Sequence, residues 1–294
     1  MHSHPQPHAQ HTQTPGSSRP FLKWSGGKAR LLSQLLPLLP RRNRLIEPFV
    51  GAGSVFLAAG FERCVINDAN PDLIAVWAAL QSRPDEFMRR SAEFFSPENH
   101  NREAYLRIRG EFNAATERFE RAVRVPYLNR FGFNGLFRVN RSGAFNVPYG
   151  APSSLPGFPE KQMAAAADRL KTCVVLNGGF MGAIEQAGCG DVLYCDPPYS
   201  PLSDAGSFVS YTAGGFGAAD HEMLVEACVV AVSRGAVALI SNHDTPATRE
   251  LYRGWRIEQV SVRRSIAADA ANRGVIRELV AILPFEAAKL TQEL

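Results

Sequence analysis

RLIEPFVGAGSVFLAAG, residues 44–60, is the stretch that decides the fold. RLIEPFV is a short apolar run that predicts a strand, and it ends at the turn Gly51-Ala52-Gly53. SVFLAAG, after the turn, predicts a helix. A glycine turn between a strand and a helix lets a ligand approach the backbone closely, where a side chain would obstruct it. The stretch therefore predicts a ligand-binding βα unit.

Further strand and helix segments follow in alternation along the chain. The predicted strands are RCVINDA, CVVLNG, DVLYC, AVALISN, WRIEQVSVRR and RELVAILPF, and the predicted helices are PDLIAVWAAL and AADHEMLVEACVVAVSRG. Repeated strand and helix segments are typical of a parallel sheet that is covered by helices. The sequence therefore predicts the α/β fold class.

Residues 84–170 interrupt this alternation. They carry many arginines and aromatic residues. Their first part has helical spacing, while NRFGFNG (129–135) and NRSGAFNVPYG (140–150) are rich in turn residues and predict loops or a short hairpin. We therefore expect a separate, mainly helical lobe at 84–170, inserted into a domain that residues 19–83 and 171–294 form together.

The overall composition sets broad limits. A chain of 294 residues with 45% hydrophobic residues can bury a substantial core, as one large domain or two smaller ones. The net charge of +4 is only a weak indication of a polyanionic partner. The five cysteines are odd in number, widely spaced and without a CxxC pair, which argues against a disulfide framework and against a zinc site. We expect no metal.

Two observations concern the cellular location. No apolar run approaches the roughly 18 residues that a membrane span needs, and the N-terminus lacks the pattern of a secretory signal. We therefore expect a cytoplasmic protein. Residues 1–18, rich in His, Gln, Pro and Ser, predict a disordered tail, with a metal-binding histidine tract as the alternative.

Asp68 strengthens the prediction that the glycine turn binds a ligand. It follows Gly51 by 17 residues and ends the next predicted strand, where a carboxylate can accept hydrogen bonds from both hydroxyls of an adenosine ribose. The third glycine of the GxGxxG phosphate motif is replaced at Phe56, which favours a nucleoside ligand without a pyrophosphate. The alternative is a tight turn beside a surface aspartate.

DPPY, residues 196–199, is the most informative tetrapeptide. It follows the apolar strand DVLYC and so lies at a strand's carboxyl end, where open α/β sheets bind their ligands. Pro197 and Pro198 fix their own φ angles and lack N–H groups, so the loop presents a carboxylate, free carbonyls and an aromatic ring in a set geometry. A plain strand-ending turn is the alternative.

Seven segments together resemble the motifs of Dam-type DNA adenine methyltransferases, the alpha class or D12 family. They are, in order, FLKWSGGK, EPFVGAGSVF, YLNRFGFNG, FNVPYG, DPPYSPLS, ISNHDT and VRRSI. The resemblance runs from about Phe21 to Pro284. It implies a Rossmann-like sheet that uses S-adenosyl-L-methionine, with residues 84–170 as the DNA target-recognition domain. The implied cofactor-binding residues are Trp24, Lys28, Phe49, Gly51, Gly53, Asp68 and Asp196.

The chemistry implied by this resemblance is methyl transfer to the N6 amine of adenine. That amine is a poor nucleophile because its lone pair is delocalised into the ring, so acceptors for its protons are needed. Asp196 and the carbonyl of Pro197 can each accept a hydrogen bond from one of these protons, with Pro198 stiffening the loop and Tyr199 stacking on the base. A duplex hides N6 within its stack, so the adenine must rotate out. Lys28 can pair with the methionine carboxylate of the cofactor.

In the insertion, arginines alternate closely with aromatic residues. Arg130, Arg138 and Arg141 are interleaved with Phe131, Phe133, Phe137 and Phe145. This mixture supplies phosphate contacts, base-edge donors and stacking surfaces together, although a small core with solvated charges is the alternative. Members of the family often carry tyrosine at the positions of Phe131 and Phe133, so any contact made through that hydroxyl is in doubt.

The resemblance also implies the duplex target GATC. Arg138 can bind guanine O6 and N7 together, Leu136 and Pro148 can touch a thymine methyl, and Lys23 is a candidate for a further base or phosphate contact. On the same loop, Phe133 can fill the stack as adenine leaves and Asn134 can hold the orphaned thymine. Arg263, Arg264 and Ser265 are expected to lie close to the DNA backbone.

Two other functions would fit parts of this sequence pattern. A methyltransferase acting on a glutamine amide or on RNA would use similar chemistry, but amide enzymes typically show Asn-Pro-Pro-Tyr and lack this inserted lobe. A DNA-binding protein without turnover is the other rival. Asp68, Asp196 and Tyr199, all intact, argue against it.

Overall fold

The computed structural model describes residues 19–199, 216–263 and 275–283, with backbone only at the facing ends of the last two ranges. The predicted tail at 1–18, together with Arg264 and Ser265, lies outside the described residues. Within the described ranges, no helix has the length and apolar character needed to cross a bilayer.

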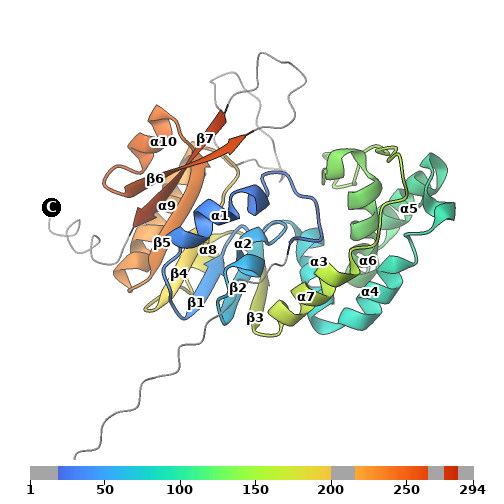
Figure 1. The fold of residues 1–294 in the computed structure, drawn as a ribbon, viewed down its shortest axis with the longest axis horizontal. Helices are drawn as coiled ribbons and strands as arrows, with labels where there is room; N and C mark the ends of the chain where they lie inside the picture. The colour runs from blue at the N-terminus through green and yellow to red at the C-terminus, as the bar shows by residue number, and fades with distance from the viewer. Residues whose placement is uncertain (1–18, 200–215, 264–274, 284–294) are drawn as a thin grey trace, which may run out of the picture.

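A seven-stranded mixed sheet forms the centre of the protein, in the order β3-β2-β1-β4-β5-β7-β6 (Figure 1). Its strands are β1 Arg44–Glu47, β2 Arg63–Asp68, β3 Cys173–Asn177, β4 Asp191–Cys195, β5 Val237–His243, β6 Arg256–Arg263 and β7 Val275–Leu283. The first five strands run parallel, and β7 is antiparallel to both β5 and β6. The predicted α/β fold class is confirmed.

The strand order reverses at β1, which pairs with β2 on one side and with β4 on the other. In an open parallel sheet such a switch point leaves a crevice at the carboxyl ends of the two strands, because the connections leave in opposite directions. The topology therefore brings together the carboxyl ends of β1, β2 and β4, where the sequence places its candidate ligand-binding residues.

Both faces of the sheet are buried, as the near-continuous apolar strands require. Adjacent residues such as Leu45 and Ile46 belong to different core clusters, because successive side chains of a strand point to opposite faces. Six described α-helices belong with the sheet: α1 Leu32–Leu35, α2 Ser54–Ala58, α3 Pro71–Ser82, α8 Met181–Ile184, α9 Ala218–Ser233 and α10 Pro246–Leu251. Two 3₁₀ turns flank α1: η1 Lys28–Arg30 and η2 Leu36–Leu38.

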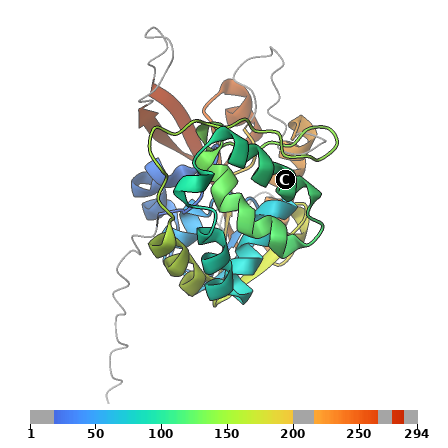
Figure 2. The ribbon, with the colours of Figure 1, turned by 90° about the vertical axis from the view of Figure 1, so that its right-hand side faces the viewer.

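Residues 84–170, which we call the inserted lobe, gather beside β3 at one end of the sheet (Figures 1 and 2). Their helices are α4 Pro84–Ala92, α5 Arg102–Ala114, α6 Arg118–Phe131 and α7 Glu160–Leu170, with 3₁₀ turns η3 Pro97–Asn99 and η4 Phe133–Gly135. Between α6 and α7 the chain folds back on itself through two isolated antiparallel bridges, Gly132 with Tyr149 and Val139 with Phe145. We call residues 132–150 the recognition loop, after the role that the resemblance implies for them.

Candidate functional site

The glycine turn connects β1 to α2 in a conformation that requires glycine. Gly53 precedes α2 with φ of 74°, in the left-handed region that L side chains rarely adopt. A Cβ there would lie 2.3 Å from the Phe56 ring, so glycine is also required for space. The missing Cβ at Gly53 thus lets the Phe56 ring pack directly against the turn.

Asp68 ends β2 beside this turn. Its Oδ2 accepts a hydrogen bond from the backbone N–H of Gly51 at 3.0 Å, and its Oδ1 accepts one from the N–H of Asn70 at 2.9 Å. Burial raises the pKa of the Asp68 carboxyl, while these backbone donors act in the opposite direction. The carboxylate is therefore fixed in orientation and retains lone pairs for further donors.

Trp24 lies against the outer side of the turn. A Cβ on Gly51 would lie 3.1 Å from Cδ1 of Trp24, so the indole packs directly on the backbone there. The Trp24 ring also stacks on Phe137 of the recognition loop, with centroids 5.6 Å apart. Trp24 therefore touches both the glycine turn and the inserted lobe.

Phe49 belongs to an aromatic cluster on the other side of the turn. Its ring centroid lies 5.5 Å from that of Phe180 and 5.7 Å from that of Phe216. Phe180 precedes α8 and Phe216 precedes α9, so three separate segments supply an apolar wall beside the carboxyl end of β1.

Asp196 follows β4 and faces a buried ammonium group. Lys28 Nζ lies 2.8 Å from Asp196 Oδ1 and also donates a hydrogen bond to the carbonyl of Gly26 at 2.8 Å. Burial raises the pKa of the Asp196 carboxyl, and the charge and hydrogen bonding of Lys28 oppose that rise. The sequence predicts that Lys28 pairs with a cofactor carboxylate, and this stays a prediction; among the described residues its ammonium pairs with Asp196.

Tyr199 completes this cluster. Its hydroxyl donates a hydrogen bond to Glu278 Oε2 at 2.8 Å, and Lys28 Nζ lies 4.6 Å from the centre of its ring. The imidazole of His243, at the end of β5, meets the ring edge to face with centroids 4.7 Å apart. Pro197 is buried and Pro198 half-buried between Asp196 and Tyr199.

Two acidic residues at this site were not identified from the sequence. Glu278 lies on β7 and contacts Tyr199, and Glu47 ends β1 with 3% of its surface exposed. Burial raises the pKa of Glu47 well above its usual value, and its Oε1 has no hydrogen-bond partner among the described residues. For Glu47 a signal existed, since it lies in the predicted strand four residues before Gly51 of the glycine turn. For Glu278 none did, because RELVAILPF reads as an ordinary strand.

The predicted DNA-binding residues lie mostly on the surface of the recognition loop. Phe133 is 48% exposed, although it is a large apolar side chain. Asn134, Arg138 and Pro148 are exposed as well, and Leu136 is half-buried. Arg138 Nε donates a hydrogen bond to Asn146 Oδ1 at 2.7 Å, which holds the guanidinium on the outer side of the loop.

The exposed Lys23 joins the N-terminal segment to the lobe through its backbone. Its N–H donates to Asn129 Oδ1 at 2.8 Å, and its carbonyl accepts from Asn129 Nδ2 at 2.8 Å. Asn129 Nδ2 also donates to the carbonyl of Gly135 at 2.9 Å, so one buried amide holds the segment and the loop together. Sequence reasoning did not single out Asn129.

Arg130 differs from the other predicted DNA contacts. It is half-buried, and its guanidinium donates a hydrogen bond to the carbonyl of Phe21 at 2.9 Å. Burial lowers the pKa of Arg130. At the opposite end of the sheet, Arg263 ends β6, where only the backbone is described.

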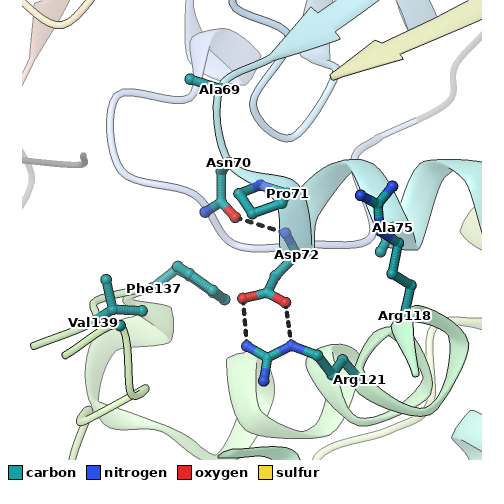
Figure 3. Close-up of a pocket in the computed structure, with 10 residues that line it drawn as sticks. Ala69, Asn70, Pro71, Asp72, Ala75, Arg118, Arg121, Phe137 and Val139 are labelled. Carbon is teal, nitrogen blue, oxygen red and sulfur yellow. Dashed lines mark hydrogen bonds and ion pairs between the residues drawn. The ribbon is translucent and has the colours of Figure 1, made fainter. Parts of the chain in front are cut away.

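A cavity of about 480 Å³ lies where the start of α3 meets the inserted lobe (Figure 3). Asn70 and Asp72 line it from one side and Arg118, Arg121 and Phe137 from the other. The guanidinium of Arg121 faces the Asp72 carboxylate through two hydrogen bonds of 2.6 and 2.8 Å. This bidentate pair ties the lobe to the sheet domain directly after Asp68.

Comparisons with known proteins identify the family of the chain. The family model of the D12 class N6 adenine-specific DNA methyltransferases matches residues 24–266. The chain is 42% identical over 265 residues to a DNA adenine methylase of Vibrio cholerae, which covers 90% of this chain and 95% of that protein.

Two further relatives carry the same name. DNA adenine methylase of Salmonella typhimurium is 41% identical over 265 residues, covering 90% of this chain and 95% of that one. DNA adenine methylase of Haemophilus influenzae is 42% identical over 267 residues, covering 90% of this chain and 93% of that one. The chain therefore belongs to the D12 class of N6 adenine-specific DNA methyltransferases.

Proposed function

We propose that the protein transfers the methyl group of S-adenosyl-L-methionine to N6 of the adenine in GATC, in double-stranded DNA, after that adenine rotates out of the helix. Membership of the family supplies the reaction class. One observation supports the cofactor and the amine acceptor: Asp68 and Asp196 stand at the carboxyl ends of β2 and β4, on either side of the glycine turn. Asp68 is thereby available to the ribose of the cofactor, and Asp196 to the amine of the target base. The target GATC rests on the resemblance of residues 129–150 to the recognition segments of family members that read this site.

The described residues fit the proposed cofactor. Asp68 is fixed by two backbone donors and keeps lone pairs for the hydroxyls of a ribose. Trp24 and Phe49 offer apolar surfaces on the two sides of the turn, and the orphaned Oε1 of Glu47 lies at the end of β1. When bound, S-adenosyl-L-methionine supplies an electrophilic methyl group on a positively charged sulfur.

The DPPY loop acts on the amine of the target adenine. The Asp196 carboxylate accepts a hydrogen bond from one N–H of the amine and the carbonyl of Pro197 accepts one from the other, which stabilises the positive charge that develops on nitrogen as the methyl group arrives. The nitrogen then releases one proton. Lys28 supports this role because its ammonium, 2.8 Å away, favours the ionised form of a buried carboxyl. The Tyr199 ring stacks on the extruded base.

The inserted lobe, residues 84–170, is proposed as the target-recognition domain, and residues 19–83 with 171–294 as the catalytic domain. The recognition loop exposes three side chains with proposed roles in DNA binding. Phe133 fills the stack that the adenine leaves, Asn134 hydrogen-bonds the orphaned thymine, and Arg138 binds a guanine edge. Arg130 donates a hydrogen bond to the carbonyl of Phe21, so we propose that it joins the lobe to the N-terminal segment in addition to contacting DNA.

Mapping the methylated adenines tests the target. Duplex DNA of mixed sequence is incubated with the protein and S-adenosyl-L-methionine, and modified adenines are located by sequencing. We expect N6-methyladenine in GATC. Methylation confined to another sequence would refute the target and leave the chemistry intact, whereas transfer to RNA or a protein amide instead of DNA would refute the proposal as a whole.

Asp196→Ala and Asp196→Asn test the chemistry. Both changes remove the carboxylate acceptor, so single-turnover methyl transfer should slow by roughly 100-fold or more while DNA affinity changes little. Glu258→Gln serves as the control, because Glu258 pairs on the surface with Arg256 of the same strand. A near-normal transfer rate in either Asp196 variant would remove that residue from the mechanism.

A further inference from the structure

Glu278 lies at the candidate site although it is far from every motif in the sequence. It belongs to β7, the antiparallel strand inserted between β5 and β6, and it stands opposite His243 of β5. Residues opposite each other in an antiparallel pair point to the same face of the sheet. The register therefore brings Glu278 to the carboxyl end of β5, beside the DPPY loop that follows β4.

The Glu278 carboxylate contacts two residues of the site at once. Its Oε2 accepts the hydrogen bond of the Tyr199 hydroxyl at 2.8 Å and lies 4.0 Å from Lys28 Nζ. Lys28 is in turn 2.8 Å from Asp196. The Glu278 side chain is only 13% exposed, and that of Lys28 only 6%, so water screens these charges weakly.

We propose that Glu278 is a positioning residue for methyl transfer: it orients the Tyr199 ring and shares the Lys28 ammonium with Asp196. The proposal rests on the function proposed above, since Tyr199 and Asp196 are the groups that meet the target base. Glu278 itself touches neither base nor cofactor in this assignment. It acts through its two neighbours.

The physical basis is a hydrogen bond that fixes a ring at its far end. A tyrosine ring can rotate about its side-chain bonds, but a bond from its hydroxyl to an ionised acceptor favours one orientation strongly. Lys28 Nζ lies 2.8 Å from Asp196 and 4.0 Å from Glu278, so Asp196 is its direct partner and Glu278 attracts the same ammonium from a longer distance. Removing Glu278 should free the ring and leave the whole ammonium to Asp196.

The first measurement is a double-mutant cycle on single-turnover methyl transfer. Glu278→Ala should slow transfer by about 10- to 100-fold, because misplacing a substrate-contacting group by about 1 Å has effects of this order. Tyr199→Phe keeps the ring and removes the hydroxyl. In the Tyr199→Phe background Glu278→Ala should then slow transfer by much less than in the wild type. Glu278→Gln, whose amide oxygen still accepts the hydroxyl, should recover most of the rate.

The second measurement is the pH profile of transfer in Glu278→Gln. The titratable groups that face Glu278, among the described residues, are Lys28 of η1, Tyr194 of β4, Asp196 and Tyr199 after β4, and His243 of β5. The negative charge of Glu278 raises the pKa of Asp196, so its removal should move the acid limb of the profile to lower pH. A purely structural role would not move this limb. Glu258→Gln on β6, with its surface pair to Arg256, is the matched control.

The outcomes separate this inference from the proposed function. The positioning role is wrong if the wild-type protein methylates DNA and the transfer rate of Glu278→Ala stays within about twofold of it. It is also wrong if Glu278→Ala slows transfer by the same factor in the Tyr199→Phe background as in the wild type. An unmoved acid limb in Glu278→Gln would equally overturn the shared-ammonium part. If instead the wild-type protein transfers no methyl group to adenine, the proposed function fails first. Melting temperatures and cofactor affinity of each variant show whether it is folded.

Discussion

Lys28 is buried between two carboxylates, with Asp196 at 2.8 Å and Glu278 at 4.0 Å. An ammonium so far from water is stable only because these groups, and the carbonyl of Gly26, replace its hydration. Its charge in return favours ionised Asp196, against a burial that acts in the opposite direction. At the scale of the residue, the ionisation of the Asp196 carboxyl, the proposed acceptor for the amine, depends on Lys28.

Lys28→Met should therefore change the pH dependence of methyl transfer. The acceptor must be ionised, so activity falls as the pH falls through the pKa of Asp196, which burial already raises. Loss of the opposite charge raises that pKa further, so the acid limb should move to higher pH. Single-turnover rates across the pH range check this. An acid limb that stays in place would show that Lys28 does not control Asp196.

Asp68→Ala should weaken the binding of S-adenosyl-L-methionine. The carboxylate is held by the N–H groups of Gly51 and Asn70, and its proposed hydrogen bonds to the ribose are worth roughly 1 to 3 kcal/mol. That range corresponds to a loss of affinity of about 5- to 150-fold. Titration calorimetry measures it directly, and an unchanged affinity would make Asp68 a structural cap of the turn alone.

At the scale of the element, the contact between α3 and α6 joins the inserted lobe to the sheet domain. Its polar part is the bidentate Asp72–Arg121 pair, in which both side chains are at most 20% exposed. The aromatic contact of Trp24 with Phe137 and the amide of Asn129 make two further links. Trp24 contacts the glycine turn at Gly51, so the position of the lobe and that of the proposed cofactor site share this contact.

Arg121→Ala should lower the free energy of unfolding by about 2 to 4 kcal/mol, because it leaves the Asp72 carboxylate without its partner in a partly buried place. The double variant Asp72→Asn with Arg121→Met should recover part of the loss. Arg89→Ala is the control: its pair with Glu93 is on the surface, and about 0.5 kcal/mol is expected. Urea unfolding measures all of them, and equal losses for Arg121→Ala and Arg89→Ala would contradict this role of α3 and α6.

At the scale of the whole molecule, the proposed DNA contacts lie at the two ends of the sheet. The recognition loop belongs to the lobe beside β3, and Arg263 ends the edge strand β6 (Figure 1). Between these ends lie the DPPY loop and the glycine turn. A duplex that reaches both ends must cross the crevice, so the two sets of arginines are expected to act in different ways.

Arg138→Ala should relax discrimination at one guanine of GATC, by roughly 1 to 3 kcal/mol, and spare cofactor binding. Arg263→Ala or Arg264→Ala should instead weaken binding to all sequences and reduce its salt dependence. Binding to GATC and to singly altered duplexes, at several salt concentrations, distinguishes the two effects. Arg89→Ala, on the surface of α4, is the matched control. Unaltered base preference in Arg138→Ala would assign the guanine to another residue.

Much of the fold could be predicted from the sequence because its signals are local. A strand shows itself by an apolar run, and the turn at Gly51 and Gly53 by the conformations that only glycine adopts easily. Asp68 and Asp196 were placed correctly at strand ends for the same reason, since each directly follows such a run. Whether these residues bind the cofactor and the base stays a prediction.

The α/β alternation and the carboxylates at the strand ends thus follow from local patterns in the sequence. Which distant groups meet depends on the tertiary packing. Glu278 reaches Tyr199 across 79 positions of the chain, and Asn129 holds Lys23 across 106. Neither contact has a local pattern, because the first depends on β7 pairing with β5 in one register and the second on α6 packing beside the N-terminal segment. Local propensities determine elements, whereas their burial against one another determines neighbours.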